Sequence, residues 1–457
     1  MDSAADRTTR AILVFWFPLA LQWMMMALEG PFLAAVIARL PDPTFNLAAY
    51  GVAFAFAILV ESPVIMLMSA STALVEDAHS YRKLRRFANQ LNVLSTLLLV
   101  LLLIPPVFDL VLRTMLGLPP EVADRVYGAF WLLLPWPAAI GYRRFIHGIL
   151  IREGRTRWIA YGTGIRLLAM AGAGIGLAFL GLPGAWVGAA ALSTGVVVEA
   201  GVAWAMSRGI IKRILEREES ERRQLAAEPT VEPGSTAEMG DRVKEPLLET
   251  RDILHFYYPL ALTSLLALTT QPLLTFFMGR APAPVESLAV FPVVMALYFL
   301  FGALGLSFQE AVIALVGRRG EHRRELARFA AGLAVTASGL LAFLAFTPLA
   351  RVWFEGISGL EPGLASLAFV PAQIVAIGPG LSVVIGLQRG LLVKARRTRP
   401  ITMATAIEVT TIALLFPALG WGLGWMGVTA AITSLMVARV FGVAFLAWAV
   451  RRTTPRT

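Results

Sequence analysis

The sequence predicts an all-α polytopic membrane protein with twelve transmembrane helices, arranged as two parallel repeats of six helices. Three observations support this fold class. The 457 residues are 57% hydrophobic and 15% charged, whereas soluble domains carry about 25% charged residues. Apolar stretches of roughly 20 residues, the length that crosses a bilayer, follow one another along the chain. The two halves of the sequence also resemble each other. This composition excludes an ordinary soluble enzyme and a disordered chain.

Twelve apolar stretches are expected to span the membrane. They cover residues 11–38, 47–75, 87–110, 124–147, 158–180, 185–207, 252–279, 288–316, 329–350, 364–388, 401–419 and 425–449. Several are longer than a bilayer requires, which predicts tilted helices or extensions into the interface.

The basic residues predict that both termini are cytoplasmic, in a bacterial cytoplasmic (inner) membrane protein. Basic residues concentrate on the cytoplasmic loops of membrane proteins. Here they gather at the termini and after the even-numbered spans, and the opposite side carries only Arg39, Arg113, Arg125, Arg280 and Arg351. The net charge of +10 is therefore interpreted as loop charge that faces anionic lipid, and not as a nucleic-acid signature.

Residues 208–251 differ in composition from both flanks, because they are rich in charged residues and contain prolines. We interpret them as a cytoplasmic linker that begins with a short amphipathic helix to about Arg223. The predicted domains are an N-terminal lobe (1–207), this linker (208–251) and a C-terminal lobe (252–457).

An internal repeat is the strongest organisational signal in the sequence. The string FWFPLAL at 15–21 recurs as FYYPLAL at 256–262, a shift of 241 residues. After one inserted residue, GILIREGRTR at 148–157 matches GLLVKARRTR at 390–399. Since each half has six spans, both halves have one orientation, which places a pseudo-two-fold axis along the membrane normal. Alternating-access transporters use this arrangement.

A six-plus-six repeat with a linker resembles the MOP superfamily, which holds the MATE exporters and the lipid-linked oligosaccharide flippases. The strings FWFPLALQ, AAYGVAFAF, FYYPLALT and QPLLTFFMGR are similar to the progressive ankylosis (ANK) family within it. This resemblance implies a two-lobed MATE-like fold with a central cavity, lined largely by spans one, two, seven and eight. It also implies export of small organic anions such as pyrophosphate, nucleotides or citrate.

Four charged residues inside the spans are predicted to form two structural ion pairs, one in each half. The repeat superposes Arg166 on Glu408 and places Glu199 within one residue of Arg439. At 1.5 Å per residue, all four lie roughly 12 Å deep. Because an unpaired charge is costly there, Arg166–Glu199 and Glu408–Arg439 are the expected pairs. A coupling role for Glu199 or Glu408 is the alternative.

Other polar residues in the spans are candidates for ion coupling or substrate contact. Glu29 and Glu61 have no evident partner in the sequence, and Gln22 lies on the same helical face as Glu29. A carboxylate that faces a cavity can bind H⁺ or Na⁺ and release it when access alternates. The alternative is a protonated carboxyl bonded to a neighbouring helix. The candidates are Gln22, Glu29, Glu61, Gln271 and Glu310.

A basic cluster near the inner end of span four is the candidate anion site. Arg143 and His147 are four residues apart and share a face, Arg144 lies beside them, and Arg389 matches His147 in the repeat. Guanidinium groups from both lobes at a cytoplasmic mouth suit phosphate or carboxylate, to which arginine donates two hydrogen bonds. Contact with lipid headgroups is the alternative.

Arg39 and Arg280 occupy equivalent positions at the outer ends of spans one and seven. Anchoring of the outer loops is the predicted role of these two arginines. Assistance in releasing anions at the outer side is the alternative.

No enzyme motif is present: the sequence lacks a P-loop, G-x-S-x-G, H-E-x-x-H and an EF-hand. The four histidines are scattered and there is no cysteine, so we expect no enzymatic activity, cofactor or metal site. The expected protein is a monomeric secondary transporter with H⁺ or Na⁺ as coupling ion. Its expected partners are membrane lipid and a small anionic substrate, and not nucleic acid. A MATE-type multidrug cation antiporter and a lipid-linked oligosaccharide flippase are the alternatives.

Overall fold

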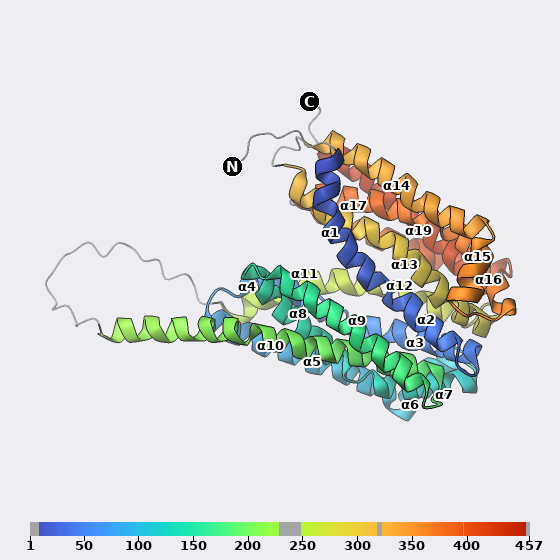
Figure 1. Cartoon of the computed structure of the whole chain (residues 1–457), viewed down its shortest axis with the longest axis horizontal. Coiled ribbons are helices and arrows are strands. Elements are labelled where there is room, and N and C mark those ends of the chain that lie inside the picture. Colours follow the sequence, from blue (N-terminus) through green and yellow to red (C-terminus); the bar gives the residue numbers. More distant parts are fainter. Residues whose placement is uncertain (1–8, 228–247, 318–321, 396, 454–457) are drawn as a thin grey trace.

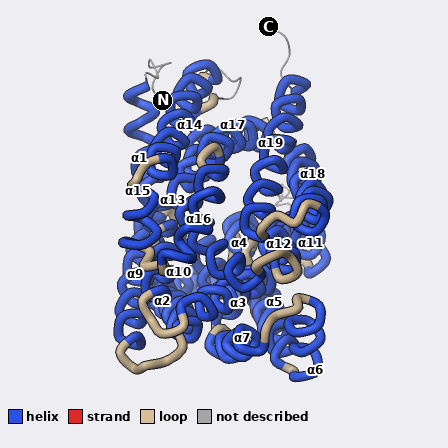
Figure 2. The backbone as a smooth tube through the Cα atoms, turned by 90° about the vertical axis from the view of Figure 1, so that its right-hand side faces the viewer, coloured by secondary structure: helices blue, strands red, loops and turns tan. Residues whose placement is uncertain are grey.

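The computed structural model describes residues 9–227, 248–317, 322–395 and 397–453, and within these ranges the chain is helical and has no strands (Figure 2). The N-terminal half forms α1 (Thr9–Ala27), α2 (Glu29–Ala38), α3 (Pro43–Glu61), α4 (Leu67–Leu74), α5 (Ala78–Leu103), α6 (Pro105–Phe108), the π-helix η1 (Asp109–Met115), α7 (Pro120–Leu132), α8 (Trp136–Arg152), α9 (Thr156–Ala178) and α10 (Gly184–Ala227). The C-terminal half forms α11 (Thr250–Leu268), α12 (Thr270–Met278), α13 (Pro284–Leu315), α14 (Arg323–Phe346), α15 (Leu349–Arg351), the π-helix η2 (Val352–Ile357), α16 (Pro362–Val375), α17 (Gly378–Lys394), α18 (Arg399–Phe416), the π-helix η3 (Pro417–Gly422) and α19 (Gly427–Thr453).

The predicted fold class is confirmed. Ten helical segments in the described ranges are long and apolar enough to cross a membrane. The two remaining predicted spans, 124–147 and 252–279, are each divided into two shorter helices, α7 with α8 and α11 with α12. The first division falls at residues 133–135, where Pro135 precedes α8, because proline cannot continue the backbone hydrogen bonding of a helix.

The amphipathic helix predicted after span six is continuous with that span. It forms the end of α10, which reaches Ala227. Most of the predicted linker that follows, residues 228–247, lies outside the described part of the chain. Hence the first section of the predicted linker is a helical continuation of the N-terminal half.

The internal repeat extends to the backbone conformation. Asp42 and Ala283, 241 residues apart, have φ angles of 53° and 50°, and each precedes a helix that begins with proline. Residues other than glycine seldom adopt this left-handed conformation. The π-helices η1 and η2 also occupy equivalent places in the two halves. The two halves therefore share local geometry that hydropathy alone could not indicate.

The first segment of each half packs on the other half. α1 contacts α13 and α14, and α11 contacts α3 and α4. Trp16 in α1 donates its indole N–H to Ser307 Oγ at 2.8 Å. The equivalent residue in α11, Tyr257, donates its hydroxyl to the carbonyl of Pro63 and packs edge-on against Phe87. These two symmetric contacts connect the halves.

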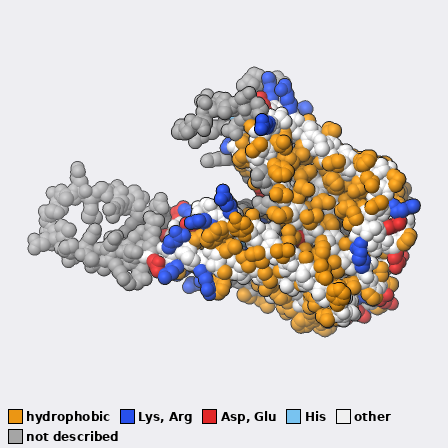
Figure 3. Space-filling view, in the orientation of Figure 1, with side chains coloured by type: hydrophobic (Ala, Val, Ile, Leu, Met, Phe, Trp, Pro, Cys, Tyr) orange, Lys and Arg blue, Asp and Glu red, His pale blue; other side chains and the backbone are white. Residues whose placement is uncertain are grey.

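Figure 1 shows the two halves as two helical bundles that approach each other at one end and diverge at the other. We name the end from which α10 extends the linker end. The opposite end, where α2 and α12 finish near Arg39 and Arg280, is the far end. In the space-filling view the surface is indented between the halves on the side of the linker end (Figure 3).

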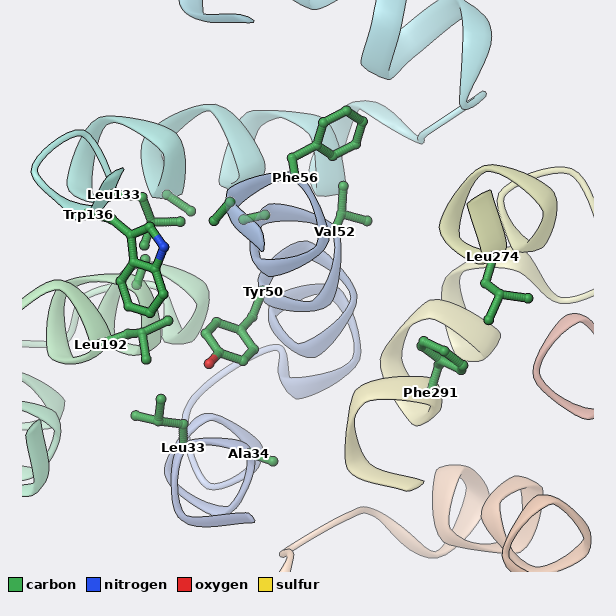
Figure 4. Close-up of a cluster of buried hydrophobic side chains, with 14 of the residues drawn as sticks. Leu33, Ala34, Tyr50, Val52, Phe56, Leu133, Trp136, Leu192, Leu274 and Phe291 are labelled. Carbon is green, nitrogen blue, oxygen red and sulfur yellow. The ribbon is translucent and has the colours of Figure 1, made fainter. Parts of the chain in front are cut away.

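Apolar side chains fill the interior and also cover the outside. Within the N-terminal half, Leu33, Tyr50, Phe56 and Trp136 belong to a core to which α2, α3 and α8 contribute (Figure 4). Hydrophobic side chains cover most of the visible surface, while lysines and arginines gather where α10 extends away (Figure 3). Phe179, for example, is 85% exposed. Such an apolar exterior is the surface expected of a protein that faces lipid.

Candidate functional site

A buried network of charged side chains links four helices of the N-terminal half. Arg166 in α9 forms an ion pair with Glu29 at the start of α2, and its Nη1 lies 3.5 Å from Glu199 Oε2 in α10. Arg143 Nη1 in α8 lies 2.6 Å from the same Glu199 oxygen. All four side chains are buried, and Glu199 is fully so. Two arginines therefore share the carboxylate of Glu199, and the carboxylate of Glu29 brings the formal charge of the four side chains to zero.

Glu199 is the common acceptor of this network. His147, one turn after Arg143 on α8, places its Nε2 4.0 Å from Glu199 Oε1. Thr163, one turn before Arg166 on α9, directs its hydroxyl to the same oxygen at 3.4 Å. Residues four or three apart share a helical face, so α8 and α9 each present two polar side chains to α10.

The structure contains the predicted Arg166–Glu199 contact but adds partners that sequence reasoning missed. The sequence shows no evident partner for Glu29, and in the structure Glu29 binds Arg166. Arg143 and His147 were expected at a cytoplasmic mouth together with Arg389, and they lie inside the N-terminal half against Glu199. The spacing of Arg143 and His147 identified their shared face. It could not identify the facing helix, because any neighbouring helix could cover that face.

The C-terminal half has a sparser version of the network. Arg439 Nε in α19 lies 3.5 Å from Glu408 Oε2 in α18, as the sequence predicts. Gln388 in α17 donates to the carbonyl of Val443 in α19 at 3.2 Å. Its neighbour Arg389 is half-buried near Glu408 and Arg439. Among the described residues, Arg389 has no carboxylate within ion-pair distance and no hydrogen bond to its buried Nε.

Glu61 lies at the end of α3, outside the main network. Its Oε2 accepts a hydrogen bond of 2.7 Å from the indole N–H of Trp136, the first residue of α8. Arg144 lies two turns further along α8. In the described part of the chain, Arg144 has no carboxylate within ion-pair distance, and its Nε is buried without a partner. Arg144 and Arg389 are thus both half-buried, and neither forms an ion pair with a carboxylate of the described chain.

The other coupling candidates lie apart from this network. Glu310 in α13 accepts a hydrogen bond of 3.3 Å from Trp23 in α1. Gln271 lies in the first turn of α12 and is half-buried. The side chain of Gln22 is outside the described part of the structure. Glu29, Glu61, Gln271 and Glu310 therefore occupy separate environments.

Two equivalent arginines connect the halves at the far end. Arg39 Nη2, after α2, donates to the carbonyls of Gly356 at 2.6 Å and Ile357 at 2.9 Å, both in η2 of the C-terminal half. Arg280 Nη2, after α12, donates to the carbonyl of Thr114 in η1 of the N-terminal half at 3.0 Å. The anchored loops belong to the opposite half in each case, so these bonds hold the far end closed.

Structural comparison identifies the fold as MATE-like. The sequence matches no protein-family model and no curated protein. A multidrug resistance MATE family transporter of the MOP superfamily, in an inward-facing conformation, is 15% identical, with a TM-score of 0.69 over 94% of this chain and 95% of that one. The lipid II flippase MurJ, in an inward closed conformation, is 14% identical, with a TM-score of 0.71 over 95% and 87%.

A third similar structure is a MOP superfamily transporter from Pyrococcus furiosus. It is 16% identical, with a TM-score of 0.61 over 98% of this chain and 97% of that one. It is described as having a binding pocket of reverse polarity that suggests a different function. Identities this low establish the shared fold alone, so the similarity to the ANK family stays a prediction.

Proposed function

We propose that this protein is a secondary-active membrane transporter that exports small organic or phosphate-containing anions, of the pyrophosphate, nucleotide or citrate class, by alternating access. The MATE-like fold supports a transporter, because parallel repeats related about the membrane normal are typical of this mechanism. H⁺ or Na⁺ is the proposed coupling ion.

The contacts between the halves support an inward-facing state. Arg39 and Arg280 close the far end, while the surface is indented at the linker end (Figure 3). If the linker is cytoplasmic, as the basic loops predict, the open end faces the cytoplasm. Two of the similar structures are also described as inward conformations.

The observation that carries the choice of substrate is the pair of half-buried arginines that form no ion pair with a carboxylate of the described chain. Arg144 in α8 and Arg389 in α17 lie on equivalent helices of opposite halves. A cation inside a membrane protein that forms no ion pair is costly, and an anionic substrate would pair with it directly. Guanidinium groups recognise phosphate and carboxylate through paired hydrogen bonds.

Substitution of these arginines tests the proposed substrate class. Arg144→Gln and Arg389→Gln should each reduce uptake of citrate, ATP or pyrophosphate into proteoliposomes by about tenfold or more, since a hydrogen bond to a charged group contributes about 1.5–3 kcal/mol. Arg152→Gln is the matched control, because Arg152 ends the same helix and pairs with Glu76 at the surface. Anion uptake that neither substitution lowers would contradict the proposal.

A multidrug cation antiporter is the second candidate, and the buried carboxylates favour it. Glu61 is buried and bonds to Trp136, so it can carry a proton or Na⁺ through the membrane interior. Transport of a cationic dye by the wild-type protein, with no uptake of any of the three anions, would identify this function instead.

Under either function, Glu61→Gln should uncouple transport from the ion gradient. Glutamine keeps the shape and can still accept the Trp136 hydrogen bond, but it cannot exchange a proton or neutralise Na⁺. We expect substrate flux in proteoliposomes to lose its dependence on an imposed pH or Na⁺ gradient. Glu76→Gln, at the surface, should leave that dependence intact. A Glu61→Gln protein that responds normally to both gradients would remove Glu61 from the coupling mechanism.

A further inference from the structure

A pocket of about 330 Å³ lies at the linker end of the N-terminal half, among α5, α8 and α10. Arg85 from α5 lines it, together with Arg208 and Lys212, which are one turn apart on α10. Tyr142 from α8 also lines it, whereas the next residue, Arg143, contacts Glu199 in the charge network. Neither Arg144 nor Arg389 lines it, so the pocket is separate from the proposed transport site.

The charges of this pocket are unequal. It has three cations and one carboxylate, Glu216, which leaves a formal excess of two positive charges. Lys212 and Glu216 form an exposed ion pair at 3.5 Å. The guanidinium of Arg208 lies 3.6 Å from the centre of the Trp204 ring, which holds it in place by a cation–π contact. Arg85 and Arg208 line the same pocket.

The position of the pocket indicates its ligand. Trp204 is half-exposed on α10, which packs on the core as far as Leu215, and tryptophan is enriched at the boundary between membrane and water. Basic pockets between membrane helices at the cytoplasmic face bind anionic headgroups. The phenols of Tyr81 and Tyr142 add hydroxyl donors beside the cations. This combination of two guanidiniums, an ammonium and hydroxyls suits a phosphate group.

We propose that this pocket binds a phosphate group, carried by an anionic phospholipid headgroup or by a soluble phosphate compound. Bound there, the phosphate would hold the beginning of the α10 extension against α5 and α8. The site is independent of the transported substrate, and it remains whichever transport function is correct.

Two binding measurements on the full chain test the site and distinguish the two sources. In the first, native mass spectrometry counts dioleoylphosphatidylglycerol and phosphatidylcholine retained by the purified protein. In the second, calorimetry follows inorganic phosphate added to the protein in phosphatidylcholine nanodiscs. The variant Arg85→Gln/Arg208→Gln/Lys212→Gln should bind more weakly by about fivefold for each cation removed.

Two further variants make the result specific. Arg452→Gln is the matched control, because Arg452 stacks on Trp448 at the end of α19 in the same way and is not among the residues that line the pocket. Arg85→Lys/Arg208→Lys keeps the charge and should keep most of the binding. Binding in the first measurement identifies a lipid, and binding in the second identifies a soluble phosphate. The proposal is overturned if neither ligand binds. It is also overturned if the triple variant binds as strongly as wild type, or if Arg452→Gln weakens binding as much as the triple variant does.

Discussion

Replacing Glu199 with glutamine is expected to lower the free energy of unfolding by about 3–5 kcal/mol, because removing one partner of a buried ion pair leaves charge without compensation. Glu199 is fully buried and holds Arg143 at 2.6 Å and Arg166 at 3.5 Å. In the variant, these two guanidiniums would share Glu29 as the remaining carboxylate of the network. The measurement is the unfolding of the purified protein in detergent, followed by heat or denaturant.

The equivalent network of the C-terminal half supplies the control. Glu408→Gln removes the same charge, but Glu408 contacts one arginine at 3.5 Å, and the Arg439 side chain is 27% exposed. We expect a smaller loss of stability, since a partly exposed cation keeps some of its hydration. Equal losses of stability in the two variants would show that contact with two arginines does not make Glu199 more important for stability than Glu408. A Glu199→Gln protein as stable as wild type would refute the network as a structural element.

Removing both far-end arginines should move the protein from the inward-facing towards the outward-facing state. Arg39 and Arg280 make three hydrogen bonds to carbonyl groups of the opposite half. A hydrogen bond to a charged group contributes about 1.5–3 kcal/mol when buried and less when exposed, so Arg39→Ala/Arg280→Ala should shift the equilibrium by about tenfold or more. We expect these bonds to break in the outward-facing state, and a shift requires such a difference between the two states.

Spin labels at the far end measure this shift. Since the chain has no cysteine, Glu121→Cys/Glu361→Cys introduces two labels, one at the start of α7 and one before α16. The distance between them should lengthen in the arginine variant. Arg113→Ala is the control, because Arg113 pairs with Asp109 and Asp124 inside its own half. An unchanged distance distribution in the double variant, or the same lengthening in the control, would exclude the proposed closure.

The residues that form the two predicted pairs show how far sequence reasoning reaches. Arg166 and Glu199, like Glu408 and Arg439, lie at matching depths on consecutive spans, and the repeat places the two pairs at corresponding positions. A charge in the membrane interior needs a partner, and consecutive antiparallel helices are usually neighbours, so both contacts follow from the sequence. Their role, in stability or in coupling, stays a prediction.

The contacts between helices distant in the sequence could not be predicted in this way. Glu29 binds Arg166, and Arg143 binds Glu199, because α2 packs on α9 and α8 packs on α10. Hydropathy identifies an apolar helix but not the helix that will cover each of its faces. For the same reason, the sequence did not predict that α1 packs on α13, where Trp16 donates a hydrogen bond to Ser307 of the other half.

The sequence by itself determined the all-helical membrane class, the succession of apolar spans and the duplication, because bilayer thickness and helix geometry constrain each segment separately. The tertiary structure decided which charges are neutralised and which are left without a partner. Arg143 became part of a buried network, whereas the adjacent Arg144 remained without a bound carboxylate. Two neighbours on one helix point in different directions, so only the packing around that helix separates a structural arginine from a candidate binding residue.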